Sequence, residues 1–141
     1  MENNEWVYSD EVKEHFLNPK NWLRDDENEW GADGKGIAGN PICGDMMLVL
    51  IKVHKDRISD IAWKTYGCAS AIASTSMLSE TAKGLTLKQA VNITPMMIAD
   101  KLGGLPENKF HCSVLGDEAL KNAIKNYYKH KDHITARTFK Y

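Results

Sequence analysis

Three cysteines are the residues of this sequence best suited to chemistry: Cys43, Cys68 and Cys112. Their odd number and wide spacing do not fit the disulfide framework of a small secreted domain. No C-x-x-C pair occurs, which excludes thioredoxin-like redox chemistry and the common zinc ribbons. Three separated thiols can be buried apolar side chains, catalytic groups or metal ligands, and composition alone does not choose between these roles.

The first cysteine lies in the segment GNPICGD (39–45), beside a carboxylate. Asp45 comes two residues after Cys43, so an extended backbone would point both side chains to the same side. Gly44 between them lets a bulky group approach the chain closely. This segment is therefore compatible with a bound ligand as well as with a simple core position.

The other two cysteines precede predicted helices. Cys68 is followed by a helix that we expect to begin near Ala69, and Cys112 follows His111 and precedes Ser113, the expected cap of the last helix. The first turn of a helix carries unpaired N–H groups and a partial positive charge. We expect this field to lower the pKa of both thiols, which favours the thiolate that binds metal.

Together these residues form a soft set of metal ligands. Three thiolates and the neutral imidazole of His111 suit zinc or an iron–sulfur cluster, and do not suit magnesium or calcium. Asp45 adds a harder oxygen ligand, so two residues compete for the fourth position. Spacing alone leaves inert, buried cysteines as the alternative reading.

The N-terminal part predicts a short helix and a long loop. Ser9 can cap a helix that Pro19 stops. Residues 25–39 are acidic and then rich in glycine, which predicts a loop with at most a short strand near residues 36–38.

Two strands and a run of helices follow. Residues 46–54 and 57–66 are rich in β-branched and apolar side chains, and residues 55–56 between them fit a hairpin turn. The predicted helices cover residues 69–83, 86–91, 95–102 and 113 to about 129. A small antiparallel sheet followed by helices that cover one face is an α+β fold.

The last predicted helix has an apolar stripe, formed by Leu115, Ala119, Ala123, Ile124 and Tyr127. We expect Asp117, Lys121 and Lys125 on the opposite face, in water. The cysteines thus fall at the junctions between elements, and the elements must bring these junctions together.

Length and composition fit one domain over residues 1–141, with mobile ends at 1–8 and 131–141. Apolar residues make up 43% of the chain, charged residues make up 26%, and the net charge is −1. The chain has no basic run interleaved with aromatic residues, so we do not expect nucleic acid as a partner. No apolar stretch is long enough for a membrane, and no signal or transit peptide begins the chain. We therefore expect a cytoplasmic protein.

With its motifs laid out, the sequence resembles the iron–sulfur cluster assembly scaffold family, of the IscU type and the N-terminal part of NifU. Four segments carry the resemblance, in the order in which the family has them: YSDEVKEHFLNPKN (8–21), GNPICGD (39–45), KTYGCASAIASTS (64–76) and LPENKFHCSVLGDEALKNAI (105–124). The resemblance implies a three-stranded antiparallel sheet with helices mainly on one face.

The resemblance also implies a function. A cysteine desulfurase delivers persulfide sulfur, iron enters, and a transient [2Fe–2S] cluster forms and passes to apo-proteins. Cys43, Cys68 and Cys112 match the cluster cysteines, and Cys112 also matches the persulfide acceptor. His111 matches a fourth ligand, and Asp45 matches the aspartate that tunes cluster lability.

The resemblance further implies partners and a rival. A heat-shock-type chaperone and its J-type co-chaperone recognise LPPVK in the bacterial scaffold, where this chain reads LPENK (105–109) with Lys109 near the site. The resemblance does not decide whether the chain forms a homodimer. The alternative is a zinc-binding, sulfurtransferase-like sulfur acceptor that uses the same Cys, Asp and His residues. A structural zinc domain would unfold on chelation, which a core of this size should survive.

Overall fold

The computed structural model describes the backbone of residues 9–40, 45–66, 69–103 and 111–139, and the side chains of residues 9–39, 46–66, 71–103 and 115–130. The elements, in chain order, are α1 (Asp10–Leu17), β1 (Gly34–Asn40), β2 (Asp45–His54), β3 (Arg57–Thr65), α2 (Ala69–Ala82), α3 (Leu87–Ala90), α4 (Pro95–Lys101) and α5 (His111–Phe139). None of the described helices is both long and apolar enough to cross a bilayer.

The three strands form one antiparallel sheet in the order β1-β2-β3. The β2–β3 hairpin turns at Lys55 and Asp56, whose φ angles of 52° and 62° suit a two-residue hairpin turn. His54 pairs with Arg57 across this turn. The predicted hairpin is therefore confirmed.

β1 is longer than the short strand predicted from the sequence, because its glycines allow a helix to pack directly on it. A Cβ atom added to Gly36 would lie 2.0 Å from the carbonyl oxygen of Ala119 and 2.3 Å from the nitrogen of Ala123. Helix α5 thus lies directly on β1, and only glycine permits this approach. The glycine-rich composition that predicted a loop instead marks a strand under a helix.

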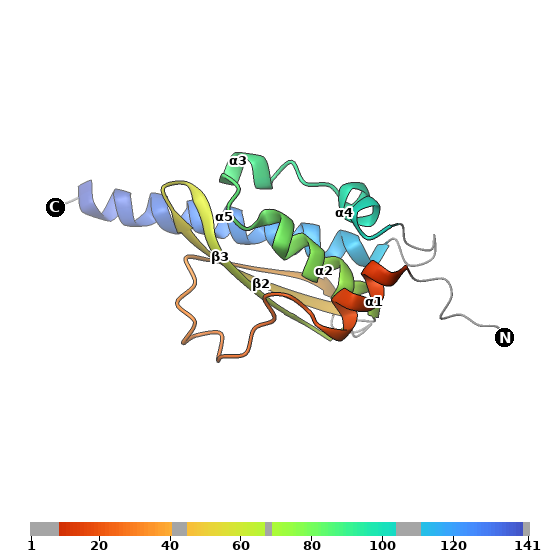
Figure 1. Ribbon diagram of the computed structural model, residues 1–141. Helices are drawn as coiled ribbons and strands as arrows, with labels where there is room; N and C mark the ends of the chain where they lie inside the picture. Colours follow the sequence, from red (N-terminus) through yellow and green to blue (C-terminus); the bar gives the residue numbers. More distant parts are fainter. Residues whose placement is uncertain (1–8, 41–44, 67–68, 104–110, 140–141) are drawn as a thin grey trace.

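Helices cover one face of the sheet and a loop covers the other (Figure 1). The main core lies between the sheet and the helices, and its largest fully buried side chains include Trp63, Met47 and Leu120. On the far face, a small cluster of Leu23, Leu48, Leu50 and Ala62 packs against Trp30 and Ala32 from the segment before β1. This arrangement confirms the predicted α+β fold with helices mainly on one face.

The predicted caps of the short helices are confirmed. Thr86 and Gln89 form a capping box at α3, and the side chains of Ser9 and Thr94 accept hydrogen bonds at the starts of α1 and α4. These caps fix the residue at which each short helix begins.

The last helix differs from the prediction at both ends. It begins at His111, so Ser113 lies within its first turn and is not the cap. It continues ten residues past Lys129 to Phe139, because residues 130–139 contain neither glycine nor proline to stop it. His111 and Cys112 are consequently the first two residues of the helix, and do not precede it.

Candidate functional site

The structure describes the surroundings of the candidate residues more fully than the residues themselves. Cys43, Cys68 and Lys109 lie outside the described residues. Asp45 is the first residue of β2, and His111 and Cys112 open α5, but the side chains of these three are not among those described. The geometry of the site therefore rests on the elements that flank it.

The ends of all three strands meet beside the first cysteine motif. Asn40 and Asp45 are the last pair of the β1–β2 ladder, and Cys43 lies between them in the sequence. The N–H of Tyr66 donates to the carbonyl of Met46 at 3.3 Å, and the hydroxyl of Thr65 donates to the same oxygen at 2.7 Å. The end of β3, three residues before Cys68, thus lies beside the start of β2.

Helices α2 and α5 join the sheet at the same place. The hydroxyl of Thr75 in α2 donates to the sulfur of Met47 in β2 at 3.5 Å. A Cβ atom on Gly116 of α5 would lie 2.9 Å from the Thr75 hydroxyl and 3.2 Å from a methyl group of Leu78. Gly116 is one helical turn after Cys112, so the start of α5 packs closely against α2.

Helix α5 runs antiparallel to β1. Asn126 accepts a hydrogen bond from the N–H of Lys35, and Asn122 donates one to the carbonyl of Ile37, both at 3.0 Å. A strand rises about 3.3 Å per residue and a helix about 1.5 Å. Along these axes Asn40 is level with the first two turns of α5, and Figure 1 shows α2 and α5 starting at the same end of the molecule.

A network of buried hydroxyl groups holds α1 against α2 at this end. The backbone N–H of Lys20 donates to the hydroxyl oxygen of Ser76 at 2.7 Å, and the same hydroxyl contacts Nδ1 of His15 at 2.7 Å. The Ser76 hydroxyl can therefore donate its proton to a neutral imidazole. Burial, followed by the charge of Lys20, lowers the pKa of His15 and keeps the ring neutral.

Asp117 is the residue near the site that the sequence analysis placed wrongly. It is only 6% exposed, although it was expected in water. One carboxylate oxygen accepts from Lys121 at 2.9 Å, and the other is buried without a hydrogen-bond partner in the described part of the chain. The spacing of four residues between Asp117 and Lys121 is typical of an exposed helix face, which misled the prediction. No local signal in the sequence marks Asp117 as buried, because its neighbours in space come from the packing of α5 on the rest of the fold.

No group of three His, Cys, Asp or Glu side chains gathers to hold a metal among the side chains that the structure describes. The side chains of the predicted ligands are not among those described. What they could bind is therefore argued from the types of these residues. Thiolates with one imidazole or carboxylate bind zinc and iron–sulfur cores.

Comparison with known proteins adds three findings. The NifU-like N terminal domain matches residues 7–134 of this chain. Iron-sulfur cluster assembly scaffold protein IscU 1 of Archaeoglobus fulgidus is 49% identical over 123 residues, which cover 87% of this chain and 78% of the relative. The scaffold protein IscU of Azotobacter vinelandii is 46% identical over 126 residues, which cover 89% of this chain and 96% of that protein.

A solved structure agrees on the fold. The N-terminal part of a nitrogen-fixing NifU-like protein from Brucella abortus superimposes with a TM-score of 0.64 and 18% identity, covering 87% of this chain and 95% of that one. At this identity the likeness concerns the fold alone. The match over residues 7–134, together with relatives of nearly one-half identity, shows that this chain belongs to the family of NifU-like N-terminal domains.

Proposed function

We propose that this chain is a scaffold on which a [2Fe–2S] cluster is assembled and from which the cluster passes to apo-proteins. Membership of the NifU-like family supports the scaffold role, because similar relatives are named as iron–sulfur cluster assembly scaffolds. The cluster is cargo in this role, and the protein is a binding platform and sulfur acceptor with no catalytic turnover of its own.

One observation carries the proposal. Described residues close to the three cysteines in the sequence converge at one end of the fold, where Thr75 donates to the sulfur of Met47 and lies beside Gly116. Cys43 is four residues before Met47, and Cys112 is four residues before Gly116. Cys68 directly precedes α2, the helix that carries Thr75. This convergence supports a single nest of thiols drawn from three distant stretches of sequence.

The total charge of the cluster and its ligands favours a cluster that can be released. An oxidised [2Fe–2S] core carries two positive charges, and three cysteine thiolates bring the site to one negative charge. His111 as a neutral fourth ligand keeps that charge, whereas Asp45 as an ionised ligand adds a second negative charge. Either one replaces the fourth thiolate of a more stable site. In this role Asp45 tunes the lability of the bound cluster.

Sulfur arrives through Cys112. The Cys112 thiolate attacks the outer sulfur of a persulfide on a cysteine desulfurase, which leaves the desulfurase thiolate and a persulfide on Cys112. That sulfur is then reduced to sulfide. Ferrous iron supplies one electron per atom as it becomes ferric, and an external electron donor or thiol supplies the rest. Apo iron–sulfur proteins receive the finished cluster.

The proposal extends to further partners and a location. A heat-shock-type chaperone with its J-type co-chaperone would act at LPENK (105–109), and a holo homodimer would share the cluster between two copies. The site of action is the cytoplasm. The rival zinc-bound sulfur acceptor would use the same residues without building a cluster.

Anaerobic reconstitution separates the scaffold from its zinc-binding rival. The purified chain is stripped of metal, then supplied with ferrous iron, cysteine, a desulfurase and a reductant. We expect visible absorption, iron and acid-labile sulfide in equal amounts, and cluster transfer to an apo-ferredoxin. A colourless protein that keeps one zinc and accepts sulfur without iron would establish the rival.

The fourth ligand is tested with paired variants. Asp45→Ala should slow transfer of the cluster to the apo-ferredoxin, because a more stable ligand set then holds it. Asp25→Ala removes an exposed carboxylate from the segment before β1 and serves as the matched control. If Asp45→Ala transfers its cluster as fast as this control, Asp45 has no part in lability.

A further inference from the structure

Helix α4 presents two methionines to solvent. Met96 is 58% exposed and Met97 is 42% exposed, although both are large apolar side chains. The same short helix is anchored by Ile98, Ala99 and, just beyond its end, Leu102, which are all buried. The two methionines are therefore not needed to hold α4 on the molecule.

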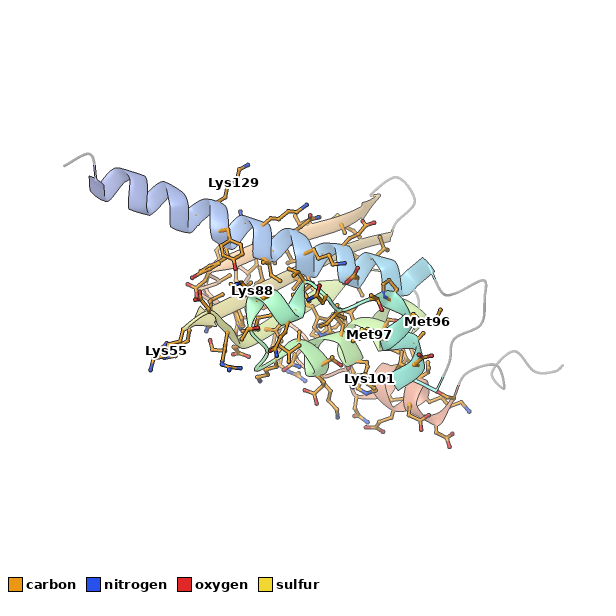
Figure 2. All side chains as sticks on the ribbon, turned by 90° about the horizontal axis from the view of Figure 1, so that it is seen from above. Lys55, Lys88, Met96, Met97, Lys101 and Lys129 are labelled. Atoms are coloured by element: carbon orange, nitrogen blue, oxygen red, sulfur yellow. The ribbon has the colours of Figure 1, made fainter. Side chains whose placement is uncertain are left out.

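Two lysines share the helical side of the molecule with these methionines. Lys101 ends α4 and Lys88 lies in α3, and Figure 2 shows both on the same side of the molecule as Met96 and Met97. We call these four residues the Met–Lys surface. Figure 1 agrees, since α3 and α4 lie on the same, helical side of the fold and are joined by a short connection.

The lysines of the Met–Lys surface lack ionic partners. Neither Lys88 nor Lys101 forms an ion pair within the part of the chain that the structure describes. Several lysines elsewhere do, such as Lys83 with Asp60 at 3.4 Å. Lys55 and Lys129 are likewise without an ion pair and lie farther out on this side (Figure 2). Lys88 and Lys101, which have no ion pair among the described residues, thus flank the two exposed methionines in the sequence.

Such a surface has a chemical preference. Methionine is flexible and polarisable, so exposed methionines adapt to varied apolar partners. Unpaired lysines around them attract carboxylates and speed the encounter with an acidic surface. Asp100 is the exposed carboxylate within α4, and it lies beside Lys101 in the sequence. The charge excess remains positive over α3 and α4.

We propose that the Met–Lys surface docks a protein partner through an acidic amphipathic segment, whose apolar side chains cover Met96 and Met97 while its carboxylates meet Lys88 and Lys101. A membrane fits less well. Helix α4 has seven residues and offers two methionines, with no Trp, Phe or Leu facing solvent, which is a small apolar face for insertion among lipids.

The position of this surface gives docking a consequence. The hydroxyl of Ser9 donates a hydrogen bond to the carbonyl of Leu102, which ties the end of α4 to the start of α1. Helix α4 also ends ten residues before His111, where α5 begins. A partner held on α4 therefore sits at the end of the molecule where α1 and α5 begin, and leaves the far face of the sheet free. Docking of a partner at this surface does not require a bound cluster.

A designed peptide tests the proposal on the metal-free chain of 141 residues. The probe is a fluorescent helical peptide of about 18 residues, with Leu at helical spacing and Glu on the flanks. A second peptide replaces every Glu by Lys. Fluorescence anisotropy should show binding of the acidic peptide only, and that binding should weaken about tenfold as salt rises to screen the charges.

Four variants locate the binding. The double variants Met96→Ser/Met97→Ser and Lys88→Glu/Lys101→Glu should each weaken binding of the acidic peptide by about tenfold or more. Two controls should bind like the wild type. Leu17→Ser changes a side chain that is 71% exposed on α1, and Lys64→Glu reverses an exposed charge on the far face of the sheet. Circular dichroism of each variant establishes that the fold is intact.

Several results would overturn the proposal. Equal binding of both peptides, or binding that survives both double variants, would show that the surface does not select acidic partners. Binding to vesicles with anionic lipids, lost in the same variants while the peptide stays unbound, would assign the surface to a membrane. Self-association of the chain that Met96→Ser/Met97→Ser abolishes, again without peptide binding, would assign it to a second copy.

Discussion

The two ends of this molecule are held together in different ways. At the hairpin end, main-chain hydrogen bonds join β3 and the hairpin turn to the chain between α2 and the start of α3. The N–H of Ile58 donates to Leu85 at 2.9 Å, Gly84 donates to Ile58 at 2.8 Å, and Leu87 donates to Asp56 at 2.9 Å. This end behaves as an extension of the sheet.

At the cysteine end, the helices meet the sheet through side chains. Thr75 contacts Met47 and Gly116, and each of these belongs to a different element. In the sequence, Cys43 lies between β1 and β2, Cys68 lies between β3 and α2, and Cys112 is the second residue of α5. We infer from this difference a division of labour, in which the hairpin end and the core keep the frame while the cysteine end binds and releases the proposed cluster.

The largest effect is expected from a change that breaks function and spares the frame. Cys112→Ser should reduce cluster assembled under anaerobic reconstitution by more than about tenfold, because it removes a ligand and the proposed sulfur acceptor. The thermal midpoint of the metal-free protein should stay close to that of the wild type. Parallel unfolding and iron–sulfide assays measure both quantities. A variant that loses its fold together with its cluster would contradict the division of labour.

A change at the packing point between the helices should damage both frame and function. Gly116→Val forces a branched side chain against Thr75 and Leu78, which should cost about 1–3 kcal/mol in the free energy of unfolding and lower cluster yield. Glu118→Val introduces the same side chain at an exposed position of α5 and is the control. Urea unfolding measures the difference. Equal stability of the two variants would mean that the helices do not meet closely at Gly116.

A change at the hairpin end should affect stability alone. Thr86→Ala removes the cap of α3, where the Thr86 hydroxyl accepts from the N–H of Gln89 at 3.1 Å, and should cost about 1 kcal/mol. Thr86→Ser keeps the hydroxyl and should restore most of that loss. Cluster assembly and transfer should not change in either variant. Slower assembly in Thr86→Ala at a temperature where it is fully folded would couple the two ends.

The smallest effect is a pH dependence that arises at His15. Burial lowers the pKa of His15 below its ordinary value of 6.5, with Glu14 and Glu80 acting in the opposite direction. The unfolded chain therefore binds a proton first as pH falls. The stabilisation is complete above about pH 6.5 and is lost as pH falls through the lower folded pKa.

His15→Gln removes this titration and should flatten the dependence of stability on pH. Urea unfolding of both proteins at several pH values between about 5 and 8 measures the two slopes. Identical slopes would show that the contact between His15 and Ser76 does not require a neutral ring.

Much of the fold could be predicted because its signals are local. The hairpin turn, the capping box of α3 and the proline at the start of α4 each depend on residues close in sequence. The family resemblance, carried by motifs around the cysteines, was likewise confirmed by the match over residues 7–134. The site residues themselves stay predictions, because Cys43 and Cys68 lie outside the described residues.

The parts that escaped prediction depend on distant contacts. From the sequence, Gly36 was predicted to lie in a loop or at most a short strand. Its place in a longer strand follows from the packing of α5, whose contacting residues are more than 80 positions later in the sequence. Asp117 reads as a solvated charge until its neighbours bury it. Both are cases in which tertiary packing overrides the local pattern. The start of α5 at His111 was missed because Ser113 offered a plausible cap two residues further along.

The central claim is that sulfur atoms from three separate segments hold one inorganic core. Iron K-edge X-ray absorption of the anaerobically reconstituted protein tests it most directly. We predict an iron–iron shell with a first shell that is mostly sulfur, and loss of the iron–iron shell when Cys43, Cys68 or Cys112 is singly replaced by serine. Isolated iron with mainly oxygen or nitrogen neighbours, or a core that survives all three replacements, would contradict the claim.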